Sequence, residues 1–153
     1  MPNNRNTGQR RAMGGRRKAR ELTVQALYQS ELAGVAVEEA VEQLCQDAGE
    51  RADLDYFRRL AGGIARRLPE LDGWIDTAVQ KWTPERISIV DRNVMRLGIY
   101  ELLAEPDVPR NVAINEAIEL SKRFGGEGSG RFVNGILDQV AAQVRKDGDP
   151  GEE

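Results

Sequence analysis

Residues 89–103 read IVDRNVMRLGIYELL, and apolar side chains fall on most sides of the helix that this stretch predicts. A helix that is apolar nearly all round must be covered by other elements, so we expect it at the centre of the fold. Ser88 and Asp91 have the spacing of a capping box, which marks the start of this helix. The stretch therefore predicts a helical protein built around one buried helix.

Six further helices are predicted on either side of this central one. Their apolar stripes run from Arg16 to Gly34, near 37–48, from Leu54 to Leu68, from Pro69 to Trp82, from Ala113 to Gly125, and from Ser129 to Val144. Asp53 and Ser129 are placed to cap two of these helices, and Pro69 is placed to begin a third. No segment alternates with period two for long enough to predict a strand. We expect an all-α fold of about seven helices.

The composition is that of a soluble globular protein, with 40% hydrophobic and 31% charged residues among 153. No run of about 18 apolar residues predicts a transmembrane helix, and the N-terminal segment lacks the apolar core of a secretory signal. Cys45 has no partner for an internal disulfide. These features predict a cytoplasmic protein without a membrane segment.

The charge is distributed unevenly along the chain. Residues 1–20 hold seven basic and no acidic groups, whereas the remainder holds 15 basic and 25 acidic groups. We expect a disordered basic arm over 1–15, a helical body over 16–146 and a flexible acidic tail over 147–153. A basic arm suits a polyanion such as nucleic acid, and on charge alone a solubilising tail explains it equally well.

The residue types argue against catalysis. The chain has no histidine and one cysteine, which excludes Ser-His and Cys-His catalysis and thiolate-rich metal sites. We therefore expect no enzyme activity, no metal and no cofactor. The glycine-rich loop 125–130 follows a helix and lacks the Lys-Ser or Lys-Thr pair of a nucleotide-binding loop. Its flanking cations and helix N-terminus could hold one RNA phosphate, although a plain linker is the simpler interpretation.

The first predicted helix carries the best candidate for RNA binding. Arg17 and Tyr28 are eleven residues apart and lie on one stripe, and Lys18 and Gln25 form the adjacent stripe. Single-stranded RNA is recognised by cations for phosphates, aromatic faces for stacking and amides for base edges. The alternative for Tyr28 is a half-buried packing residue, and spacing leaves both open.

The whole sequence resembles the NusB family over nearly all of residues 16–141. Four segments carry the resemblance in order: RRKARE with VQALY at 16–28, KW with IVDRNVMRL and YEL at 81–102, VP with VAINEAIEL at 108–120, and KRFG with S and RFVNGILD at 122–138. The resemblance implies seven helices in two small packed bundles. It also implies binding of the boxA element of nascent ribosomal RNA together with the ribosomal protein NusE, within the RNA polymerase antitermination complex.

The resemblance assigns two surfaces by position. The RNA surface would include Arg16, Arg17, Lys18, Arg20, Gln25, Tyr28, Arg110, Lys122, Arg123, Ser129, Arg131, Phe132 and Asn134. The NusE surface would include Val79, Trp82, Glu85, Asp91 and Arg92. Phe132 could stack on a base or anchor the core. An acidic surface with Glu85 and Asp91 would suit a basic ribosomal protein.

Two positions depart from the family pattern, and two other functions remain open. Gly128 stands where relatives often have Asn or Asp, and Val79 where some have an aromatic residue. The helical domain that accompanies RNA methyltransferases is one alternative, but the chain has no room for the catalytic half. A structural helical protein is the other, and some family members are thought to form homodimers through the arginine-rich surface.

Overall fold

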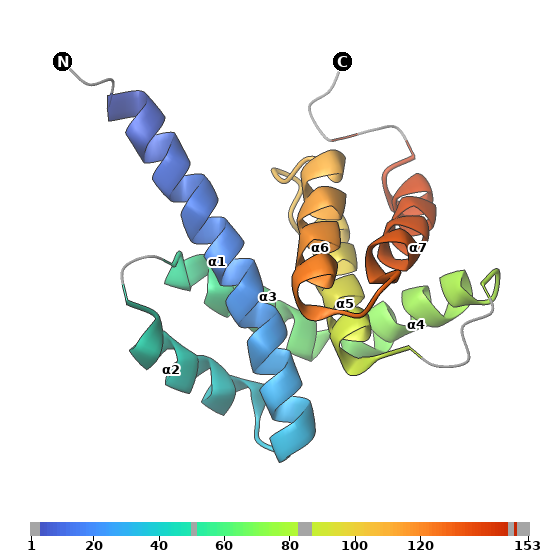
Figure 1. Cartoon of the computed structure of the whole chain (residues 1–153), viewed down its shortest axis with the longest axis horizontal. Coiled ribbons are helices and arrows are strands. Elements are labelled where there is room, and N and C mark those ends of the chain that lie inside the picture. The colour runs from blue at the N-terminus through green and yellow to red at the C-terminus, as the bar shows by residue number, and fades with distance from the viewer. Residues whose placement is uncertain (1–3, 50–51, 83–86, 147–148, 150–153) are drawn as a thin grey trace. The chain divides into compact units, whose positions relative to one another are not determined.

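The computed structural model describes residues 4–49, 52–82, 87–146 and 149 (Figure 1). The described residues form seven helices and no strand: α1 (Asn4–Ala33), α2 (Val37–Ala48), α3 (Leu54–Arg66), α4 (Leu68–Val79), α5 (Ile89–Ala104), α6 (Arg110–Phe124) and α7 (Ser129–Val144). The chain divides into two compact units, Met1–Gly63 and Ile64–Glu153. The predicted all-α fold is therefore confirmed.

The first unit is built from α1, α2 and most of α3. α1 buries a stripe of apolar side chains at helical spacing, including Ala19 and Leu22. It ends at Ala33, directly before Gly34, whose φ of 69° is a left-handed conformation that glycine adopts at little cost. At the start of α3, Oδ1 of Asp53 accepts a hydrogen bond of 3.0 Å from the N–H of Tyr56. The cap predicted for Asp53 is confirmed.

The start of α1 differs from the sequence prediction. We expected the first helix to begin at Arg16, but α1 begins at Asn4. Once a helix is nucleated, each added residue closes one more backbone hydrogen bond. Residues 9–13 are good helix formers, and they extend the helix despite the unfavourable glycines on both sides. The division into arm, body and tail stays a prediction, and most of the tail lies outside the described residues.

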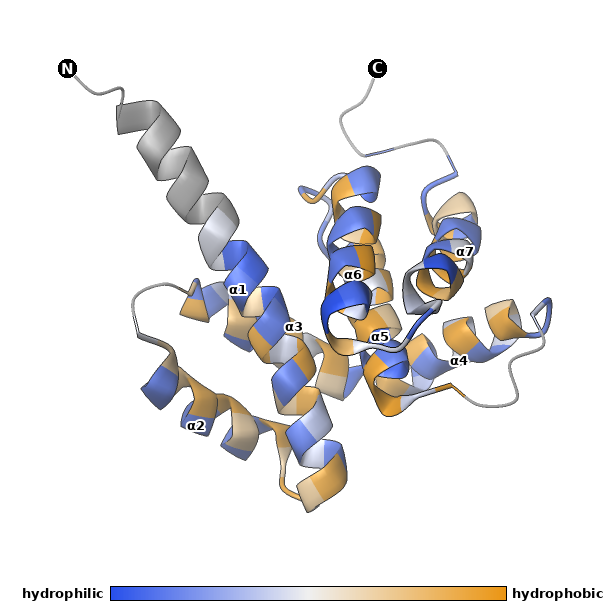
Figure 2. Cartoon of the chain, in the orientation of Figure 1, coloured by the Kyte–Doolittle hydropathy of each residue, from blue (hydrophilic) through white to orange (hydrophobic). Residues whose placement is uncertain are grey.

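α5 is the centre of the second unit, as predicted. Every residue from Asn93 to Leu102 is buried. α6 and α7 pack on α5 and on each other, and α4 packs on α5 and α7. Gly98 permits this close packing, since a Cβ there would lie 2.8 Å from a methyl carbon of Leu137. Hydrophobic and hydrophilic residues alternate along α6 and α7 in Figure 2, as expected of helices with one packed side and one exposed side.

α4 has the predicted start but ends early. Pro69 lies in its first turn, where the missing N–H leaves no helical hydrogen bond broken. The N–H of Trp82 bonds to the carbonyl of Val79 at 2.8 Å, a tight turn that takes the chain out of the helix. The apolar stripe that we predicted from Pro69 to Trp82 is longer than the helix, because Trp82 follows α4 and is 37% exposed.

Candidate nucleic-acid interface

The cations of α1 do not all reach the surface of the first unit. Arg17 is exposed, and Lys18 keeps 44% of its side chain exposed although its ammonium lies 3.4 Å from Glu21. Arg16 is half-buried, with its guanidinium carbon 4.4 Å from the centroid of the Tyr56 ring. Of the cations predicted here, Arg17 and Lys18 are the best placed to meet a phosphate.

The position of Arg20 does not match the RNA contact that the sequence predicted for it. Its residue is only 4% exposed, and its guanidinium carbon lies 5.7 Å from the centroid of the Tyr56 ring. Four residues along a helix return to nearly the same face, so Arg20 follows Arg16 onto this ring. Burial argues against the direct RNA contact that we predicted for Arg20 and indicates a packing role.

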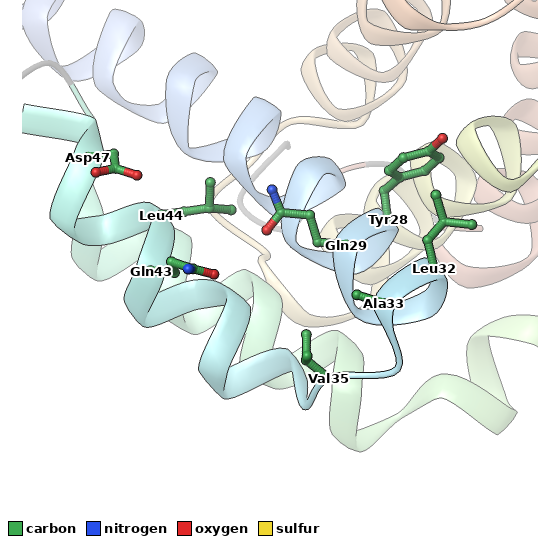
Figure 3. A pocket seen from close by; sticks show the side chains of 8 residues that line it. All are labelled: Tyr28, Gln29, Leu32, Ala33, Val35, Gln43, Leu44 and Asp47. Atoms are coloured by element: carbon green, nitrogen blue, oxygen red, sulfur yellow. The ribbon is translucent and has the colours of Figure 1, made fainter.

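The second half of α1 exposes Gln25 and Tyr28, both predicted to read bases. About 16 Å of helix axis separates Arg17 from Tyr28. Tyr28 borders a hollow of about 460 Å³ that is lined by residues of the α1 end, its following turn and α2: Tyr28, Gln29, Leu32, Ala33, Val35, Gln43, Leu44 and Asp47 (Figure 3). None of the described residues that line this hollow is a cation. The Tyr28 end of α1 therefore suits a neutral base or apolar group better than a phosphate.

In the second unit, the start of α7 is organised around a buried carboxylate. The Ser129 hydroxyl donates a hydrogen bond of 3.1 Å to Oδ2 of Asp91 on α5. Both residues are buried, Asp91 being 8% exposed. The loop backbone also lies close to this carboxylate, because a Cβ on Gly125 would be 2.9 Å from its Oδ1. Only glycine permits the backbone at position 125 to lie this close to the Asp91 carboxylate.

This arrangement corrects three predictions. Ser129 does not cap α7, because its hydroxyl is used by Asp91, and the N-cap residue is Gly128 with a φ of 86°. Asp91 does not offer its carboxylate to a partner, because that group is buried against α7. The Ser88 cap is present, since its Oγ accepts the N–H of Asp91 at 3.0 Å, but the Asp91 side chain points to Ser129 instead of completing a capping box.

Several predicted RNA residues are exposed where α6 ends and α7 begins: Lys122, Arg123, Arg131 and Asn134. Lys122 lies 3.6 Å from Glu119, and an exposed pair of this kind holds its lysine weakly. Arg110, at the start of α6, is half-buried, with its guanidinium 4.0 Å from Asp138. The cations near the loop are therefore more available to an anion than Arg110.

The same surface holds an aromatic residue that sequence reasoning missed. Phe124 is 48% exposed, and the guanidinium carbon of Arg123 lies 5.1 Å from its ring centroid. A cation beside an exposed ring offers both charge and a stacking face. Its position at the last residue of α6, directly before the glycine loop, was the available signal.

Phe132 and Trp82, predicted for different partners, contact each other. Their rings meet edge to face, with centroids 5.8 Å apart and planes at 82°. Gly135 makes this possible, because the indole occupies the space that any Cβ at that position would fill. A ligand that displaced the Phe132 ring would therefore also disturb Trp82. The two predicted surfaces would then be coupled within the second unit.

The remaining predicted partner residues lie near the ion pairs of α4 and α5. Arg92 is half-buried and bonds to Asp72 at 3.4 Å and Asp76 at 3.2 Å. Arg96 makes two shorter bonds to Asp72, at 2.7 and 2.8 Å. Burial raises the pKa of Asp72, but hydrogen bonds and charge from Arg96 and Arg92 outweigh it and hold the pKa below its usual value. Val79 is half-buried, and Glu85 lies outside the described residues.

Other kinds of site find no support in the part of the chain that the structure describes. Across residues 4–49, 52–82, 87–146 and 149, no three metal-ligating side chains gather into a possible ion site. Every helix in those ranges is too short or too polar to cross a membrane. The candidate sites are instead the exposed cationic and aromatic surfaces.

These features define a two-unit, all-helical protein with exposed cationic and aromatic surfaces on its helices. The chain belongs to the NusB family, whose family model matches residues 17–142. It is 45% identical to the transcription antitermination protein NusB of Myxococcus xanthus, over 88% of this chain and 99% of that one. It is 41% identical to NusB of Desulforapulum autotrophicum, over 92% and 99% of the two chains.

Solved structures of NusB proteins are also similar to this chain. A structure of T. maritima NusB is similar with a TM-score of 0.75 and 42% identity, covering 84% of this chain and 91% of that one. A second similar structure contains the antitermination factors NusB and NusE in complex with dsRNA. It has a TM-score of 0.73 and 25% identity, covering 82% of this chain and 95% of that one.

Proposed function

We propose that this chain is a cytoplasmic, RNA-binding transcription antitermination factor that acts without catalysis. It binds the boxA element of nascent ribosomal RNA together with NusE, and the complex helps RNA polymerase resist termination. The observation that carries the proposal is the α1 surface, where Arg17 and Lys18 are exposed at one end and Tyr28 at the other. Relatives named transcription antitermination proteins support it over nearly their whole length.

Each type of side chain would make a different kind of contact with RNA. Arg17, Lys18, Lys122, Arg123 and Arg131 would neutralise phosphates, which supplies most of the affinity but no sequence information. Tyr28 would stack on a base, and Gln25 and Asn134 would bond to base edges. Stacking and edge contacts give the preference for one RNA sequence over another.

NusE would bind the second unit around α4 and the turn that follows it. A ribosomal protein is typically basic, and Asp76 is an exposed carboxylate on this helix. Its pairing with Arg92 leaves 64% of its side chain exposed, so Asp76 replaces buried Asp91 as the acidic group that orients the partner. Trp82 and Val79 supply apolar contact area beside it.

Fluorescence anisotropy with a boxA-like RNA and a scrambled control, each with and without NusE, tests this proposal. With about four phosphate contacts to single-stranded RNA, affinity should fall about 50-fold between 50 and 200 mM salt. Arg17→Ala combined with Lys18→Ala removes two of these contacts and should reduce that fall to about 7-fold. The helical content should stay unchanged, because both side chains are on the outside of α1.

The control variant is Arg58→Ala with Arg66→Ala, which removes two exposed arginines from α3. It should behave like the wild type if the α1 surface is specific. Equal, weak binding to both RNAs that NusE does not change would refute the proposal. A helical homodimer found by light scattering in that case would support the structural alternative.

A further inference from the structure

We infer that the hollow between α1 and α2 is a docking site for a basic, amphipathic helix of a protein partner. The inference does not depend on the proposed RNA-binding function, and it concerns the first unit alone. Leu32, in the last turn of α1, is 58% exposed, more than any other large apolar side chain in the described part of the chain. Tyr28, one turn earlier, is 39% exposed. The α1 wall of the hollow therefore presents apolar side chains to solvent.

The hollow is formed by two packed helices and a bonded turn. It has a volume of about 460 Å³ and lies between the end of α1 and α2 (Figure 3). In the turn, the Ser30 hydroxyl donates a hydrogen bond of 2.6 Å to the carbonyl of Val35. Leu44 of α2 is buried and lines the hollow, so its inner surface is apolar as well. A partner that binds here does not have to order the site first, which lowers the entropic cost of binding.

The charge around the hollow determines what kind of partner fits. Residues 21–49, which include all that line the hollow, hold six acidic side chains and no basic one: Glu21, Glu31, Glu38, Glu39, Glu42 and Asp47. Glu39, Gln43 and Asp47 follow one another at intervals of four along α2, and all three are exposed. Asp47 itself lines the hollow. This acidic edge repels a phosphate and attracts a cationic side chain.

The apolar interior and the acidic edge together favour one occupant. A groove with an apolar interior between two helices is the form of site that an amphipathic helix fills. Such a helix would place a large apolar side chain against Leu32 and Leu44, and a lysine or arginine beside Asp47. An RNA strand would bring its phosphates to the acidic edge. A second copy of this chain, docked by the same surface on both subunits, would bring a second acidic edge.

The test measures binding of a fluorescein-labelled synthetic helix of leucine and lysine, with all leucines on one face, to the full chain by anisotropy. A control peptide has the same composition in an order that spreads the leucines around the helix. The wild-type chain should bind the first peptide about tenfold more tightly, because only that peptide buries a continuous apolar face.

Two pairs of variants locate the binding on the hollow. Leu32→Ser should weaken binding of the amphipathic peptide about tenfold, whereas Val112→Ser, which removes an exposed apolar side chain from α6, should not. Asp47→Asn should weaken binding about threefold and lower its salt dependence. Asp55→Asn removes an exposed carboxylate of α3 that does not line the hollow, so it should keep the wild-type affinity. Tyr28 is left unchanged because it also belongs to the proposed RNA surface.

The other outcomes would overturn the inference. Equal binding of the two peptides, or equal losses in Leu32→Ser and Val112→Ser, would show only general attraction of cations to an acidic chain. Loss of boxA-like RNA binding in Leu32→Ser, with peptide binding unchanged, would assign the hollow to a base. A dimer that light scattering detects for the wild type but not for Leu32→Ser would assign the hollow to a second copy. Peptide losses in Leu32→Ser and Asp47→Asn, with RNA binding unchanged, would support the inference.

Discussion

Replacing Arg145 with methionine removes a side chain that makes five hydrogen bonds within the second unit. The Arg145 side chain is only 3% exposed, and its guanidinium bonds to carbonyls at the C-terminal end of α5. Its hydrogen bonds reach the carbonyls of Glu101, Leu102, Glu105 and Val108 at 2.7–3.2 Å, and the carboxylate of Asp149 at 2.6 Å. The positive charge also opposes the negative end of the α5 dipole.

The expected loss follows from these contacts. Methionine retains most of the apolar stem, so the substitution isolates the hydrogen bonds and the charge. Removing one partner from a buried, charged network costs about 3–5 kcal/mol of unfolding free energy, because the other partners stay buried without compensation. For a chain of this length, that loss lowers the melting temperature by about 10 °C.

Thermal and urea unfolding, followed by circular dichroism, measures this loss. Asp149→Asn is the control, because an amide oxygen still accepts a hydrogen bond from Arg145 and the carbonyl contacts remain. We expect that variant to lose less than Arg145→Met, because it removes the charge of Asp149 but keeps the hydrogen-bond acceptors around the guanidinium. A loss below about 1 kcal/mol for Arg145→Met, or equal losses for both variants, would refute the reasoning that the buried carbonyls need this arginine.

Three further predictions concern the second unit. Asp72→Asn should destabilise the fold at neutral pH, because Arg96 and Arg92 lower the pKa of Asp72 in the folded state. The stability that the Asp72 carboxylate adds is therefore present above its ordinary pKa of 3.8 and is lost as the pH falls through the folded-state pKa. Urea unfolding should show that the difference in unfolding free energy between this variant and the wild type shrinks in acid. Gly135→Val should expel the Trp82 indole and shift its fluorescence to longer wavelength in a Trp74→Phe background, and an unchanged spectrum would contradict the contact. Gly128→Ala should cost about 1–2 kcal/mol in the same unfolding assay, since its φ of 86° strains a residue with a Cβ, whereas Asn should cost less.

The predictions that held were those that depend on residues close together in the chain. The apolar pattern of 89–103 determines a helix with no exposed side, and α5 is that helix. The caps at Asp53 and Ser88, and the start at Pro69, depend on contacts within three or four residues. Local sequence specifies such features because the partners are always within reach, whatever the rest of the fold does.

The candidate site was predicted by residue type but not by side-chain position. Charge and spacing identified Arg17, Lys18 and Tyr28 as candidates but left the exposure of Tyr28 open. In the structure Arg17 and Tyr28 are exposed, and the Lys18 side chain is 44% exposed. The same reasoning could not predict that Arg20 is buried while Arg17 is exposed. Both are arginines on one helix, and only the packing of Tyr56 against α1 decides which of them is buried.

The sequence by itself determined the helices, their central member and the chemical types available for binding. Tertiary structure alone decided that Asp91 is buried with Ser129, that Trp82 packs against Phe132 and Gly135, and that Arg16 of α1 lies against the Tyr56 ring of α3. The partners in these contacts lie 38 to 53 residues apart in the chain. No local pattern records such pairs, because they form only when separate helices pack and bring their side chains into reach.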